Sequence, residues 1–196
     1  SSQAQRRLLE LAKSARQASE KVRSACASYS TPIDYGIAPL DLNKIAALIN
    51  ADMNTRLYYT SFRRNAFDTH VQQPNLHQRL LTYFSDAVSG FFSDMERIGR
   101  ADDVVMLVFS EFGRRVAENT NLGTDHGTAN NMYLIGKAVK GGHYGDLPSL
   151  TELNDGNMLH TTDFRQVYAT AISGWLGLEA HEQVLRYRFN DFPVFS

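Results

Sequence analysis

The sequence feature that most limits the fold is a continuous apolar run, DVVMLVF, at residues 103–109. A strand that is covered on both faces has this pattern, because the residues that point to each of its two faces are all apolar. The run follows a long segment, residues 76–98, whose apolar side chains recur at helical spacing and which Gly99 is expected to end. Together with the helices and strands expected on either side, this alternation predicts an α/β fold with a parallel or mixed sheet.

Apolar spacing and turn residues predict further helices and strands on either side of this pair. Helices are expected at residues 3–26, from a cap at Asp41 through residues 42–53, and from a cap at Thr162 to a stop at Gly177; strands are expected at residues 55–62 and 131–136. About three good strands are fewer than the roughly five or six of an average sheet. We therefore expect part of the sheet to be missing from the chain.

The composition is that of a globular domain without a basic surface. Of the 196 residues 43% are hydrophobic and the formal net charge is -1, so nothing favours nucleic acid as a partner. No apolar run approaches the roughly 20 residues that span a bilayer. The single cysteine, Cys26, excludes an internal disulfide and a cysteine-based zinc site, and we expect it to be a buried, inert thiol.

The segment SYSTPIDYGIAP contains two prolines and a glycine, which are typical of a connection between structural elements. We place a boundary there, with an N-terminal helical segment at residues 1–30 and a domain at residues 31–196. The first residues, SSQAQRRLLELAK, are polar and charged, and we recognise no signal peptide in them.

Three polar clusters lie beside predicted strands, where open α/β sheets bind ligands. The first, FDTH, places Asp68 and His70 two residues apart, so that both point the same way in an extended segment. A carboxylate and an imidazole suit zinc, iron or manganese. An Asx-type turn with a hydrogen-bonding histidine explains the same residues. Spacing leaves both interpretations open, and His77 fits the surface as well as it fits a ligand.

The second cluster, SEFGRR, follows the apolar run at residues 103–109. Glu111 stands where a carboxylate meets the ligand crevice rather than the core. An ion pair with Arg114 or Arg115 explains it equally well. The two arginines could instead bind an oxyanion such as phosphate or sulfate through bidentate hydrogen bonds.

The third cluster, GTDHGT, precedes the strand predicted at residues 131–136. Gly123 and Gly127 bracket Asp125 and His126 and allow the backbone to turn sharply beside a ligand. The alternative is a flexible loop in which Asp125 accepts backbone hydrogen bonds and His126 is an ordinary polar residue. The three clusters together favour a metal site, because metal sites take their ligands from separate loops.

No activated nucleophile is recognisable in the sequence. It contains no G-x-S-x-G elbow, and Cys26 is distant from the clusters. Ser110 and Thr69 lie beside candidate ligands, yet nothing marks either hydroxyl as activated. The catalytic residues are therefore unknown, and hydrolysis would depend on a metal-activated water or on a nucleophile outside the chain.

The segments FDTH, SEFGRR, GTDHGTA and VKGGHYGDLPSL, followed by TDFRQVYATAISGWLGL, resemble the bacterial domain-of-unknown-function family fifteen-oh-one. That family is similar to the alkaline phosphatases and sulfatases. The resemblance runs, in order, over about residues 30–180. It implies an alkaline phosphatase-like sheet flanked by helices, of which this chain holds an incomplete, C-terminal part.

The resemblance also implies a site and a cofactor. Asp68, His70, Glu111 and His126 would be the ligands of a divalent metal, for which zinc is the expected candidate. To this set we add Arg114 as the anion-binding residue, from the chemistry of its guanidinium. The implied function is metal-dependent hydrolysis of phosphate or sulfate esters, with a small-molecule ester as substrate. Family members are exported to the periplasm, although no export signal is recognised in this chain.

The chain departs from the superfamily pattern in three ways. Asp68 and His70 are closer together than usual, Phe112 follows Glu111 where a nitrogen ligand is expected, and the first strand and the nucleophile are not contained in the sequence. The alternative is therefore a degenerate, non-catalytic binding or structural domain of the same fold, with the missing N-terminal half as its partner. Substrate identity and oligomeric state do not follow from the sequence.

Overall fold

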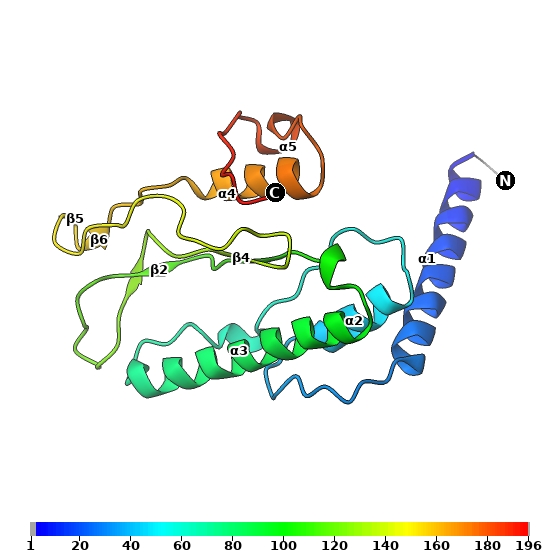
Figure 1. The fold of residues 1–196 in the computed structure, drawn as a ribbon, viewed down its shortest axis with the longest axis horizontal. Helices are drawn as coiled ribbons and strands as arrows, with labels where there is room; N and C mark the ends of the chain where they lie inside the picture. Colours follow the sequence, from blue (N-terminus) through cyan, green and yellow to red (C-terminus); the bar gives the residue numbers. More distant parts are fainter. Residues whose placement is uncertain (1–2, 196) are drawn as a thin grey trace. The chain divides into compact units, whose positions relative to one another are not determined.

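The computed structural model describes residues 3–195 and divides into two compact units (Figure 1). The first unit contains the chain up to Ala66 together with Leu80–Arg100. The second contains Phe67–Arg79 together with the chain from Ala101 onward. Residues 31–66 therefore cluster with the preceding helix, and the domain boundary at residue 30 stays a prediction.

The first unit is helical, because apolar side chains recur at helical spacing along most of it. Its helices are α1 (Gln3–Ser28), α2 (Leu42–Asn50) and the part of α3 (Gln73–Arg97) from Leu80 onward, with a 3-10 turn at Arg63–Asn65. These confirm the three helices predicted for this part of the chain, and Gly99 follows α3 at a φ of 71°. The buried apolar side chains of this unit are Ala25, Leu42, Ala46, Ala47, Ile49, Ala87, Phe91 and Met95.

A buried carboxylate, Asp94, joins α3 to the segment that follows α1. Its oxygens accept hydrogen bonds from the hydroxyls of Tyr29 (2.6 Å), Tyr35 (2.6 Å) and Thr31 (2.7 Å), and from Nε of Arg97 (2.7 Å). Asp94 is fully buried. Because four donors, one of them the Arg97 guanidinium, compensate for the loss of water, the segment is tied to the helix by a satisfied polar network.

The Asp94 network shifts the pKa values of its members. Burial acts to raise the pKa of Asp94, but the hydrogen bonds from its four donors outweigh burial and hold that pKa below its ordinary value. Burial, reinforced by the neighbouring Asp94 carboxylate, raises the pKa of Tyr29 to about 12 and raises the pKa of Tyr35 further. The network therefore contains an ionised carboxylate and neutral tyrosines across the physiological range.

The second unit combines short strands with short helices. Its sheets are two-stranded and antiparallel: β1 (Met106–Val108) with β4 (Tyr133–Ile135), β2 (Gly113–Arg114) with β3 (His126–Gly127), and β5 (Leu153–Asn154) with β6 (Asn157–Met158). The remaining elements are a 3-10 turn at Ala101–Asp103, α4 (Phe164–Thr170), a π-helical turn at Ala171–Trp175 and α5 (Glu182–Leu185). In Figure 1, α4 and α5 lie together near the C-terminus, in agreement with the contacts between them.

The mixture of helices and small antiparallel sheets fits the α/β class, but the predicted parallel or mixed sheet is wrong for the described residues, where every ladder is antiparallel. The strand predicted at residues 55–62 is also wrong. This segment pairs with no other described strand, and Leu57 and Tyr59 are 73% and 78% exposed. β-Branched and aromatic composition does not make a strand where no neighbour completes the ladder.

The run at residues 103–109 does contain a strand, β1, but its residues are half-buried rather than covered on both faces. β4 confirms the strand predicted at residues 131–136. The alkaline phosphatase-like sheet implied by the resemblance is not seen among residues 3–195. In the same range, no helix has the length and apolar character needed to cross a membrane.

Two predicted helix caps differ in detail from the structure. Asp41 precedes α2, but its carboxylate accepts hydrogen bonds from Lys44 (2.7 Å) and Arg63 (2.8 Å) instead of from the helix backbone. At α4 the cap is Asp163 rather than Thr162, and the Asp163 side chain accepts from the amide two residues on at 2.9 Å. A carboxylate next to a lysine and an arginine forms charge-assisted bonds in preference to a neutral cap.

Replacing Asp94 with Asn removes the charge and turns one acceptor oxygen into a donor that faces another donor. We expect Asp94→Asn to lower the free energy of unfolding by about 2–4 kcal/mol, because buried donors lose their partner. Urea denaturation followed by circular dichroism measures this. Glu96→Gln, on an exposed position of the same helix, is the control. Equal stability of the two variants would contradict the network's role.

The raised pKa of Tyr29 predicts a loss of stability in alkali. A folded-state pKa above the ordinary value contributes stability that is complete below pH 10 and is lost as the pH rises through about 12. The urea midpoint should therefore fall between these pH values. Tyr29→Phe should flatten that fall, and an unchanged slope in this variant would show that other groups cause it.

Candidate metal site

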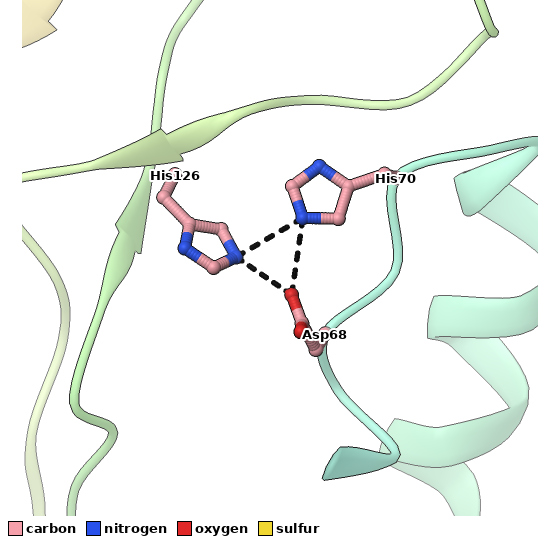
Figure 2. A group of neighbouring side chains, drawn as sticks. All are labelled: Asp68, His70 and His126. Atoms are coloured by element: carbon pink, nitrogen blue, oxygen red, sulfur yellow. Dashed lines mark hydrogen bonds and ion pairs between the residues drawn. The ribbon is translucent and has the colours of Figure 1, made fainter.

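Three side chains of the second unit converge on one point (Figure 2). Oδ1 of Asp68 lies 3.0 Å from Nε2 of His70 and 2.7 Å from Nε2 of His126, and the two Nε2 atoms lie 3.1 Å apart. Asp68 and His70 come from the loop that precedes α3, and His126 comes from β3. Residues that are 56 positions apart in the sequence thus place three ligand-type atoms on one small triangle.

The chemistry of these atoms fits a cation. The hydrogen bond from His126 is the main cause that holds the pKa of Asp68 below its ordinary value, with a smaller contribution from His70, so the carboxylate offers lone pairs only. With a cation between them, both imidazoles would present the Nε2 lone pair to it. Ligands at about 2.1 Å from an octahedral or tetrahedral ion lie about 3.0–3.4 Å from one another. The observed triangle is close to that size, and these three residues could hold a metal ion.

A buried polar chain connects the two loops that carry the ligands. Nε2 of Gln73 donates to Oγ1 of Thr69 (2.9 Å), and Oε1 of Gln73 accepts from Oγ1 of Thr124 (2.7 Å). Thr69 and Gln73 are only 6% and 9% exposed. Thr69 lies between Asp68 and His70, so this chain fixes the middle of the first ligand loop.

Asn119 makes a second connection. Its Nδ2 donates to the carbonyl of His70 (3.1 Å) and to Oδ1 of Asp125 (3.1 Å), while its Oδ1 accepts from the amides of Asn121 and Gly123. The Asn119 side chain therefore folds the 119–123 turn and attaches it to the His70 backbone.

Asp125 is placed to orient His70. Its Oδ1 lies 3.7 Å from Nδ1 of His70, and the hydrogen bond from Asn119, followed by interaction with His70, holds the pKa of Asp125 below its ordinary value. With a cation bound at Nε2, the Nδ1 proton of His70 would point toward this carboxylate, as in other metal sites where a carboxylate orients a ligating histidine.

Phe112 covers His126. The two rings are stacked, with centroids 3.8 Å apart and planes at 9°. The resemblance makes position 112 the place of a second nitrogen ligand, and here that place holds a ring that packs on the His126 imidazole. Phe112 thereby restricts the rotation of the His126 ring.

The structure thus brings together three of the four predicted metal ligands: Asp68, His70 and His126. Glu111 is exposed in the bend after β1 and lies outside this group, so its role as a ligand stays a prediction. Arg114 also stays a prediction as an anion-binding residue, but its guanidinium already donates to two backbone carbonyls. His77 lies edge-on to Phe67 with ring centroids 5.5 Å apart and is not in the group.

Sequence reasoning missed the residues that support the ligands: Thr69, Gln73, Thr124 and Asn119. A signal for one pair was present, because Thr69 and Gln73 are four residues apart at the start of a helix, where side chains meet. An asparagine followed by a glycine four residues later, as at Asn119 and Gly123, is also typical of a turn that an asparagine side chain closes by accepting backbone hydrogen bonds. No local pattern points to Thr124, because its partner, Gln73, lies 51 residues away.

Glycine is required where the two loops meet. A Cβ on Gly123 would overlap the carbonyl group of His70. We expect Gly123→Ala to displace His70 and to lower the free energy of unfolding by roughly 1–3 kcal/mol. Gly141→Ala is the control, because a Cβ there meets nothing within 4 Å. Thermal melts of both variants test this, and a Gly123→Ala protein as stable as the control would disprove the close approach.

Comparison with known proteins identifies the family but no characterised relative. The family model described as "Protein of unknown function (DUF1501)" matches residues 4–191. No curated protein and no solved structure matches the chain. The match covers nearly the whole sequence, including all three residues of the triangle, and so the chain belongs to the DUF1501 family of proteins of unknown function.

Proposed function

We propose that this chain binds one divalent metal ion, with zinc as the first candidate, through Asp68, His70 and His126. We further propose that the site belongs to a hydrolase-type domain for phosphate or sulfate esters. The observation that carries the proposal is the triangle of one carboxylate oxygen and two imidazole nitrogens with sides of 2.7–3.1 Å. Two histidines and one carboxylate are a common ligand set for catalytic metals that keep open positions for substrate.

The neighbouring residues support metal binding in distinct ways. Oδ1 of Asp125, 3.7 Å from Nδ1 of His70, would favour a proton on Nδ1 when Nε2 binds the ion. Phe112 restricts the ring of His126. All three ligand side chains are about 40% exposed, so a small ester can reach the site from solvent. When bound, a divalent cation would supply Lewis-acid polarisation of a phosphoryl or sulfuryl oxygen.

Two hydroxyls, of Thr69 and Ser110, lie beside the candidate ligands in the sequence. Thr69 is buried and its Oγ1 accepts from Gln73, which makes it part of the framework. Ser110 is exposed and its Oγ donates to the carbonyl of Phe112 at 3.1 Å. Neither hydroxyl is assigned as the nucleophile. The second candidate function is a metal-binding domain of the same fold that does not catalyse hydrolysis.

Metal binding is tested by equilibrium dialysis of the purified chain against zinc, followed by metal analysis. We expect a single equivalent of zinc in the original chain and a large loss in His126→Ala, because two of the three ligands cannot hold the ion alone. His143→Ala is the control, since His143 is exposed and outside the triangle. Equal zinc content in His126→Ala and His143→Ala would rule out this site.

The catalytic part of the proposal is tested separately, with an aryl phosphate and an aryl sulfate as substrates. Zinc-dependent turnover that disappears in His126→Ala and persists in His143→Ala would support the hydrolase. Stoichiometric zinc without turnover of either ester would support the non-catalytic alternative. Turnover that survives in His126→Ala would refute the role of the triangle in hydrolysis.

A further inference from the structure

We propose that Arg114 is a positioning residue that sets the distance between the metal ligands by joining the two loops that carry them. This inference rests on the proposed metal site and assigns the Arg114 side chain a task other than direct contact with an anion. It is based on hydrogen bonds, strand pairing and ring contacts of Arg114 within the second unit.

The guanidinium of Arg114 donates to one backbone carbonyl from each ligand loop. Nη2 donates to the carbonyl of Phe67 at 2.6 Å, and Nη1 donates to the carbonyl of Thr124 at 2.6 Å. Phe67 directly precedes Asp68, and Thr124 stands two residues before His126. Hydrogen bonds from a cationic donor are roughly twice as strong as neutral ones, so this side chain connects the backbones that carry the carboxylate and the second imidazole.

The shape of the guanidinium makes this connection specific. Its nitrogens are fixed in one plane, and the two terminal nitrogens therefore hold the two carbonyl oxygens at a defined separation. A lysine ammonium has the same charge but is a single point on a flexible stem. It can reach one carbonyl but does not impose the distance between two. The separation of the loops thus depends on the shape of Arg114 as well as on its charge.

Arg114 also contacts the environment of His126 by two other routes. In the pairing of β2 with β3, Arg114 stands opposite His126. Its guanidinium carbon lies 5.0 Å from the centroid of the Phe112 ring, the ring that stacks on His126. Arg114 therefore constrains the position of His126 in three ways: by backbone pairing, by its cation–π contact with Phe112 and by its hydrogen bond to the carbonyl of Thr124.

Charge and burial agree with a fixed guanidinium. Burial is the main influence on Arg114 and lowers its pKa, while the negative charges of Asp68 and Asp125 oppose this effect. The half-buried cation thus lies among the carboxylates of the site, with both terminal nitrogens engaged by backbone oxygens. This arrangement resembles the outer partners that orient ligands in metal sites, whose removal typically costs 10–100-fold in metal affinity.

The test uses the full chain and Co²⁺, whose visible absorption reports the geometry of the ligands. Three variants are titrated beside the original protein: Arg114→Lys, which keeps the charge, Arg114→Gln, which keeps one amide donor, and Arg188→Lys as an exposed control. We expect Arg114→Lys and Arg114→Gln to bind Co²⁺ about 10–100-fold more weakly, with an altered spectrum at saturation. Arg188→Lys should match the original protein, and circular dichroism identifies which Arg114 variant is folded.

A second titration separates positioning from anion binding. Inorganic phosphate is added to each protein after saturation with Co²⁺. If Arg114 is a positioning residue, Arg114→Lys binds Co²⁺ more weakly, but once it is saturated with Co²⁺ its affinity for phosphate is close to that of the original protein. Unchanged Co²⁺ affinity and spectrum in a folded Arg114 variant would overturn the inference, and a loss of phosphate binding alone would identify Arg114 as an anion-binding residue. If the original protein binds no Co²⁺, the proposed metal site fails and the inference fails with it.

Discussion

The candidate site depends on keeping two distant loops at a fixed separation. One loop carries Asp68 and His70, and the other carries His126. Neither loop is held by a long strand, since residues 66–72 contain none and β3, which carries His126, is two residues long. Polar side chains do this instead, through the Thr69–Gln73–Thr124 chain, the bonds of Asn119 and the guanidinium of Arg114. A satisfied polar network of this kind specifies geometry where apolar burial is limited.

The same principle holds the first unit together at a different place. There, Asp94 accepts four hydrogen bonds and attaches an irregular segment to a long helix. The two networks differ in whether their carboxylate oxygens remain accessible to a ligand from solvent. Every oxygen of Asp94 is used by donors in a buried position, whereas the Asp68 carboxylate is partly exposed and faces two imidazoles. The first network is therefore structural, and the second has the character of a binding site.

The sequence predicted the features that arise from local patterns. Helical spacing located α1, α2 and α3, and the clusters FDTH and GTDHGT supplied all three residues of the triangle. Failures arose where the outcome depends on distant partners. Residues 55–62 have strand composition but no described strand to pair with. The run at residues 103–109 forms β1, which pairs with β4 but is half-buried instead of covered on both faces. Gln73 and Arg114 act across about 50 residues of sequence, which no local pattern encodes.

Binding of one metal ion by Asp68, His70 and His126 together is tested most directly by X-ray absorption spectroscopy of the zinc-loaded chain, because imidazole ligands give characteristic outer-shell scattering. We expect zinc coordinated by two imidazoles and oxygen, and loss of one imidazole in His126→Ala. Zinc without imidazole scattering, or with the same scattering in His126→Ala, would show that the three residues do not bind the ion together.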